Sequence, residues 1–116
     1  RNVVNIRRDE KTSMGSKSEK LERAVRAYSN FTETVPIALL LSLFLFFNNL
    51  HIFSLPSIIL LAIGRKIHSD AISNINENIK NRVLGMKLTI RSIFLSSFGI
   101  LYYLSQLIYF AITSYK

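Results

Sequence analysis

The chain of 116 residues contains no cysteine, which excludes disulfides, thiolate metal sites and a cysteine nucleophile. Its two histidines, His51 and His68, are far apart in the sequence and fall on opposite sides of the membrane predicted below, so no metal site is expected. The four glycines form no phosphate-binding loop. No serine stands in a recognisable nucleophile elbow with a base beside it. The usual sequence signals of metal, nucleotide and thiol enzymes are therefore missing.

Charged residues are also scarce, at 19% of the chain, whereas 49% of the residues are hydrophobic and the mean hydropathy is +0.27. This balance is unusual for a soluble domain with a net charge of +8. The chain is long enough for one domain but too short for a catalytic module beside a membrane anchor. We therefore expect a single all-α integral membrane domain over residues 1–116, with any chemistry among its membrane helices.

Three apolar stretches predict helices at residues 19–48, 55–73 and 82–113, after a polar juxtamembrane loop at residues 1–18. The last helix gives the clearest signal, because residues 93–112 carry no charge over 20 positions. The polar segment 74–81 is expected to be a loop. This order predicts a multi-pass membrane protein.

The helix boundaries carry their own signals. Ser18 stands before an acidic first turn and predicts the start of the first helix. Ser54 is placed to cap the second helix, where Pro56 suits the first turn. Pro36 lies inside the first helix and removes one backbone hydrogen bond, so a kink there would open space beside Glu33.

The basic residues flank the apolar spans. All 15 except Lys116 lie in the N-terminal loop, at the head of the first helix, or between the foot of the second helix and Arg91. By the positive-inside tendency, the N-terminal and second loops face the cytoplasm or its organellar equivalent. This pattern suits bacterial inner, mitochondrial and endoplasmic reticulum membranes equally. A pI near 10.1 is also typical of nucleic-acid binding, but the topology accounts for the charges and no nucleic-acid partner is expected.

A polar stripe on the first helix is the strongest candidate for a binding site. Arg23, Arg26, Asn30 and Glu33 fall within a sector of roughly 80° and span about 15 Å along the helix. Arginine forks suit carboxylates, and Glu33 can accept from an amine, so an anionic peptide-like ligand with one free amine would match. Alternatively, the two arginine side chains extend to the membrane–water interface, and Asn30 and Glu33 make polar contacts with neighbouring helices. Glu33 favours the binding hypothesis, because a carboxylate in lipid needs a partner or a water-filled cavity.

The other helices supply further polar residues. Arg65 and His68 share one face of the second helix at a spacing of i, i+3. A histidine there can act as an acid or base, although a hydrogen bond to a neighbouring helix is its more common role. Lys87 and Arg91 form a basic face near the start of the last helix at i, i+4.

Three segments resemble the MAPEG family, the membrane-associated proteins in eicosanoid and glutathione metabolism. They are ERAVRAYSNFTETVPIALLL at 22–41, GRKIHSDAI at 64–72 and RVLGMKLT at 82–89. The resemblance covers nearly the whole chain in order. It implies a four-helix membrane bundle that assembles as a homotrimer, with glutathione between adjacent subunits near the cytoplasmic side. Three helices are evident here, so the resemblance also implies that the first helix lies before Arg1.

The resemblance also assigns roles to residues. The matches to glutathione contacts or to positions lining the same pocket are Arg23, Arg26, Asn30, Glu33, Arg65 and His68. Eicosanoid-producing members have a tyrosine at the position of Ile72. Their thiolate-activating arginine falls near Met86 or Lys87, with Arg82 and Arg91 as the nearest alternatives. Lys87 and Arg91 are therefore the catalytic candidates, although the ammonium group of a lysine lacks the planar, paired hydrogen-bond donors of a guanidinium group.

Two functional hypotheses follow. In the first, the chain is a glutathione transferase or peroxidase, in which Lys87 or Arg91 holds the thiolate that attacks a lipophilic electrophile arriving from the bilayer. In the second, it is a non-catalytic structural subunit with heterologous partners in a larger membrane complex, as Ile72 and the missing arginine suggest. A transporter is less well supported, because the spans show no repeat and no broken helix pair.

Overall fold

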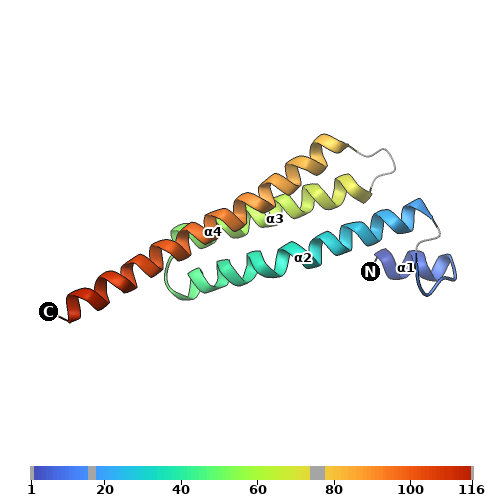
Figure 1. Cartoon of the computed structure of the whole chain (residues 1–116). Coiled ribbons are helices and arrows are strands. Elements are labelled where there is room, and N and C mark those ends of the chain that lie inside the picture. The colour runs from blue at the N-terminus through green and yellow to red at the C-terminus, as the bar shows by residue number, and fades with distance from the viewer. Residues whose placement is uncertain (1, 16–17, 74–77, 116) are drawn as a thin grey trace.

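The computed structural model describes residues 2–15, 18–73 and 78–115 (Figure 1). Within these ranges the chain forms four helices and no strand: α1 (Asn2–Asp9), α2 (Glu19–Phe47), α3 (His51–Ser73) and α4 (Ile79–Ser114). Successive long helices run in opposite directions, and α1 lies beside the head of α2. The three long helices are each long and apolar enough to cross a membrane. The predicted all-α class and multi-pass membrane localisation are confirmed.

The first helix lies where the sequence predicts a loop. Residues Asn2–Asp9 are helical, and Ile6 is buried against Leu21 and Ala24 of α2, with Val3 beside it. A helix of this length is marginal in isolation, so docking of its apolar side on α2 is what stabilises it. Such a contact with a distant segment is not visible in the local composition on which the loop prediction rested.

The starts of α3 and α4 also differ from the predictions. The Leu50 carbonyl accepts from the backbone N–H groups of Phe53 and Ser54, each at 3.1 Å, after Asn49 has turned the chain with φ of 60°. Helix α3 therefore begins at His51, and the cap predicted at Ser54 is wrong, since this side chain is fully buried within the helix. The Asn78 side chain accepts from the Asn81 N–H at 3.3 Å, so α4 begins at Ile79. Residues 74–77 of the predicted loop lie outside the described residues.

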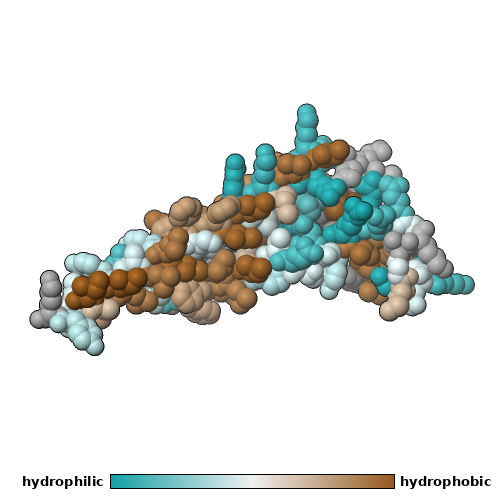
Figure 2. All heavy atoms as spheres, viewed as in Figure 1, coloured by the Kyte–Doolittle hydropathy of each residue, from teal (hydrophilic) through white to brown (hydrophobic). Residues whose placement is uncertain are grey.

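The surface is divided into an apolar part and a polar part (Figure 2). Apolar side chains cover the bodies of the long helices, and polar side chains gather at the end where α1 lies. The last turns of α4 continue past the turn between α2 and α3, and residues 104–115 are all exposed. A continuous apolar surface of this extent is typical of contact with lipid. The polar end is the one that the positive-inside tendency predicts to face the cytoplasm or its organellar equivalent.

Four buried serines join the three long helices. Ser42 of α2 lies 3.0 Å from both Ser57 of α3 and Ser96 of α4, measured between hydroxyl oxygens. The Ser57 and Ser96 hydroxyl oxygens are 2.6 Å apart, and Ser57 also donates to the Ser92 carbonyl at 2.8 Å. Small polar residues let membrane helices approach closely and hydrogen-bond to one another. This serine cluster therefore fixes how the three helices align.

Replacing Ser57 with alanine should lower the free energy of unfolding by about 1–2 kcal/mol, because it removes several hydrogen bonds between helices at once. Reversible unfolding in detergent would measure the change. Ser97→Ala is the matched control, since Ser97 bonds only to the Ile93 carbonyl of its own helix in the described structure. Equal losses from both variants would contradict a role for the cluster in joining the helices.

Candidate functional site

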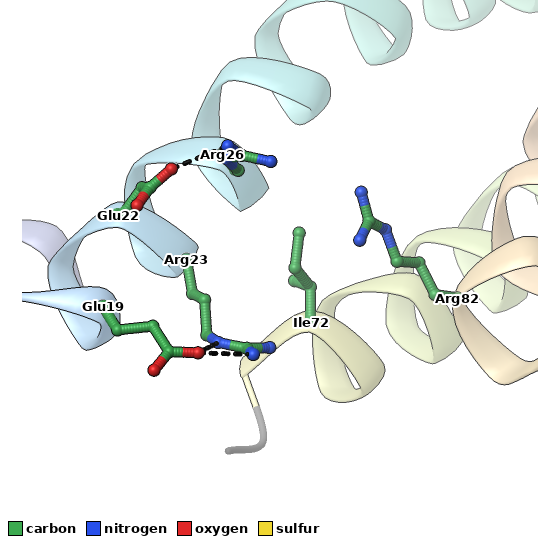
Figure 3. Close-up of a pocket in the computed structure, with 6 residues that line it drawn as sticks. All are labelled: Glu19, Glu22, Arg23, Arg26, Ile72 and Arg82. Carbon is green, nitrogen blue, oxygen red and sulfur yellow. Dashed lines mark hydrogen bonds and ion pairs between the residues drawn. The ribbon is translucent and has the colours of Figure 1, made fainter. Parts of the chain in front are cut away.

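A polar groove lies between the head of α2, the foot of α3 and the first turns of α4. Its outer hollow, of about 190 Å³, is lined by Glu19, Glu22, Arg23, Arg26, Ile72 and Arg82 (Figure 3). Its inner hollow, of about 240 Å³, is lined by Arg26, Ser29, Asn30, Glu33, His68, Ile72 and Arg82. The two hollows share Arg26, Ile72 and Arg82, so they adjoin, and together they make up the polar groove.

Two ion pairs line the outer hollow on α2. Arg23 contacts Glu19 and Arg26 contacts Glu22, each at 2.7 Å and one helical turn apart. The Arg26–Glu22 pair is exposed on both sides, whereas Arg23 is partly buried in its pair. Exposed pairs are weak, so a ligand carboxylate can replace Glu22 as the partner of Arg26 at low cost. Figure 3 shows the guanidinium of Arg26 directed across the hollow toward that of Arg82 on α4. The two positive groups thus face a space that suits an anion.

The inner hollow combines an acceptor with an amide. Glu33 is exposed there and accepts a hydrogen bond from the Ser29 hydroxyl at 3.0 Å. Asn30 is half-buried, and its amide nitrogen lies 3.8 Å from the Met86 sulfur on α4. Glu33 therefore faces a solvent-accessible space, as a carboxylate this close to an apolar run requires.

His68 connects α3 to the start of α4. Its Nδ1 lies 3.1 Å from the Arg82 carbonyl oxygen, and because a carbonyl only accepts, Nδ1 carries the proton and donates. The histidine is buried at the wall of the inner hollow. This bond holds the first turn of α4 against α3 and so helps to place the Arg82 side chain at the groove.

The structure brings most of the predicted binding residues together. Five of them line the groove: Arg23, Arg26, Asn30, Glu33 and His68. The sixth, Arg65, lines neither hollow and lies behind Asn30, where its Nη1 donates to the Asn30 side-chain oxygen at 2.6 Å. Arg65 therefore borders the groove only through Asn30 and would not contact a ligand there directly.

The predicted catalytic residues lie elsewhere. Lys87 lines a separate surface hollow of about 390 Å³ formed by α4 alone, and Arg91 is exposed without lining the groove. The positive residue that α4 contributes to the groove is Arg82, which the family resemblance implied only as an alternative. The signal for it is a buried stripe of small residues at spacings of three and four: Gly85, Thr89, Ser92, Ser96 and Gly99. Arg82 continues this stripe by one turn, whereas Lys87 and Arg91 lie off it.

A model described as the MAPEG family matches residues 1–105 of the chain. The matched range includes α1, α2 and α3, the groove residues, and α4 up to residue 105. No curated protein and no solved structure matched the chain.

Proposed function

The chain belongs to the MAPEG family, and on this basis we propose that the polar groove binds glutathione for transfer to lipophilic electrophiles. One observation carries the proposal: the stripe residues that resemble the family's glutathione contacts line a single groove together with His68 and Arg82. If the stripe residues served only to anchor the helix at the membrane interface, they would not be expected to line a groove.

The groove complements the charges of the tripeptide. Glutathione has two carboxylates and one ammonium group, and Arg23 and Arg26 offer forks of donors suited to carboxylates. Glu33 offers an acceptor for the ammonium group. On binding, the ligand carboxylates take the place of Glu19 and Glu22 as partners of the arginines. Because ion pairs at the surface are weak, this exchange of partners costs little free energy.

Arg82 is the proposed stabiliser of the thiolate. A guanidinium beside a thiol lowers the pKa of the thiol and so raises the thiolate fraction at neutral pH. The thiolate sulfur then forms a bond to the electrophilic carbon, and the leaving group departs with its electron pair. In a peroxidase reaction the same sulfur attacks a peroxide oxygen, the O–O bond breaks and the other oxygen leaves as an alcohol. A second glutathione then attacks the resulting sulfenic acid, which gives glutathione disulfide and water.

The proposal extends to a homotrimer in which the groove meets a neighbouring copy. Lys87 and Arg91 are exposed on α4 of their own chain, so a second subunit is required to bring them to a bound thiol. Their catalytic role stays a prediction for that arrangement. The lipophilic substrate would reach the groove from the bilayer that surrounds the apolar helices.

A structural subunit is the second candidate, and Ile72 favours it. This side chain is buried and lines both hollows, so it contributes no hydroxyl at the position where the eicosanoid-producing relatives carry a tyrosine. Migration in mild detergent discriminates between the candidates. A recruited subunit comigrates with heterologous proteins, whereas the enzyme migrates as a homotrimer and transfers glutathione.

Arg26→Ala and Glu33→Ala should each raise the Kd for glutathione at least about tenfold, because each removes a charge-assisted hydrogen bond worth about 1.5–3 kcal/mol. Calorimetry on the purified protein would measure the affinities. Lys20→Ala is the control, since Lys20 is exposed on the same helix and lines neither hollow. An absence of glutathione binding by the wild type would overturn the proposal.

A further inference from the structure

Arg65 is a buried cation with neutral neighbours. The residue is only 8% exposed, and its Nη1 contacts the Asn30 side-chain oxygen at 2.6 Å and the Thr34 hydroxyl at 3.4 Å. Its guanidinium carbon lies 5.8 Å from the centre of the Phe31 ring. Among the described residues no carboxylate pairs with it. A buried charge is costly without good hydrogen bonds, so the short bond to Asn30 is its main compensation.

This bond decides which way the Asn30 amide points. Arginine has only donors, so the atom of Asn30 that faces it must be the carbonyl oxygen. The amide nitrogen then points the other way, toward Met86 and the inner hollow. A thioether sulfur is a weak acceptor, so a ligand oxygen can readily replace it as the partner of this nitrogen.

We infer that Arg65 is a positioning residue that fixes Asn30 as a hydrogen-bond donor toward the groove. The ligand group beside Asn30 is then an acceptor, either a carboxylate or a peptide carbonyl. The ammonium group of the ligand is directed instead to Glu33, one turn further along α2. The identity of the ligand rests on the proposed function, whereas the link between Arg65 and Asn30 stands on geometry alone.

The first experiment needs no ligand. Unfolding midpoints in detergent are compared for wild type, Asn30→Asp, Arg65→Met and the double variant. Asn30→Asp should unfold at or above the wild-type midpoint, because a carboxylate is a better partner for the buried guanidinium. The midpoint of the double variant should be lower than the two single shifts added together predict, because its carboxylate no longer faces a cation. Additive effects would show that the two side chains do not interact and would overturn the inference.

The second experiment measures the Kd for glutathione. Asn30→Asp keeps the contact with Arg65 but loses both N–H donors, so its Kd should rise at least about tenfold although its midpoint is preserved. Asn30→Leu is neutral and close in size, and a similar rise there would exclude charge repulsion as the cause. Arg65→Met releases the amide and should raise the Kd by about three- to tenfold, whereas Arg65→Lys retains a donor and should recover part of the loss.

Lys66→Met is the matched control for Arg65, because Lys66 is the adjacent, exposed cation on α3, and its Kd should stay within about twofold of the wild type. Wild-type affinity in Asn30→Asp would mean that Asn30 serves as an acceptor and would overturn the inference. If the wild type does not bind glutathione, the proposed function fails, and the unfolding comparison still decides whether Arg65 positions Asn30.

Discussion

Replacing Arg82 with methionine is expected to lower the turnover of glutathione transfer at least about 100-fold, while the Kd for glutathione changes by less than about tenfold. The expected size is that of removing one charge stabiliser from an active site, about 10²–10³ in kcat. Methionine keeps the length and apolar stem of the side chain, and the Arg82 carbonyl that accepts from His68 belongs to the backbone. The assay pairs steady-state conjugation with thiolate absorbance of the bound glutathione.

The pH dependence of the Arg82→Met variant provides a second readout. If the guanidinium lowers the pKa of the bound thiol, wild-type turnover reaches its plateau at a pH below the ordinary thiol pKa of about 8.5. In the variant that pKa returns toward its ordinary value, so turnover rises with pH through this range and recovers part of the loss. A purely structural defect would lower turnover equally at every pH.

Lys87→Met and Arg91→Met are the controls for this experiment. Both residues are exposed cations on α4 outside the groove, so each variant should retain most of its turnover if the thiolate is stabilised within one chain. A large loss in Lys87→Met together with normal turnover in Arg82→Met would contradict the role of Arg82. It would place the thiolate beside a residue of a neighbouring copy instead.

The sequence predicted the features that depend on one helix. A long apolar stretch predicts a membrane span without reference to its neighbours, and all three spans were found. The spacing of Arg23, Arg26, Asn30 and Glu33 predicts a shared face by helical geometry alone, and these residues line one groove. The chemistry of a single helix face is thus accessible from sequence.

Several features that depend on contacts between helices were not predicted. Helix α1 forms because Ile6 finds a site on α2, and α3 begins early because Asn49 adopts a positive φ. The position of Arg82 in the groove follows from which side of α4 packs on α3. That side is recognised by its small residues rather than by its charges. The prediction of Lys87 and Arg91 rested instead on the family resemblance, in which Arg82 was only an alternative.

The packing of α4 on α3 leads to the prediction with the largest effect on stability, Gly85→Ala. A Cβ atom at Gly85 would lie 2.6 Å from the His68 nitrogen, 2.7 Å from the Gly64 carbonyl oxygen and 2.8 Å from the His68 Cα. All three are backbone atoms, so no side-chain rotation relieves the overlap and the helices must move apart. We expect the free energy of unfolding to fall by about 2–4 kcal/mol, at or above the usual cost of overpacking. Unfolding in detergent would measure it.

The sign of this effect separates packing from helix propensity. Alanine is the better helix former by about 1 kcal/mol, so Gly85→Ala should stabilise α4 if propensity decided the outcome. Gly99→Ala is the matched control on the same buried stripe, because its new Cβ would meet side-chain atoms of Leu45 and Phe53 rather than backbone. The Leu45 Cδ1 can rotate away, and only the Phe53 Cβ is held in place by the backbone, so the control should lose less. Equal losses in the two variants, or a stable Gly85→Ala, would contradict the backbone contact.

The same substitution should also weaken the groove. Gly85 lies one turn from Arg82, and two of the three atoms that a Cβ at Gly85 would displace belong to His68, which donates to the Arg82 carbonyl. Separating α4 from α3 at this point moves Arg82 away from Arg26 and widens the groove where the two hollows adjoin. Glutathione binding measured well below the unfolding midpoint should therefore fall in Gly85→Ala and persist in Gly99→Ala. Normal binding in Gly85→Ala would show that the groove does not depend on the close approach of the two helices.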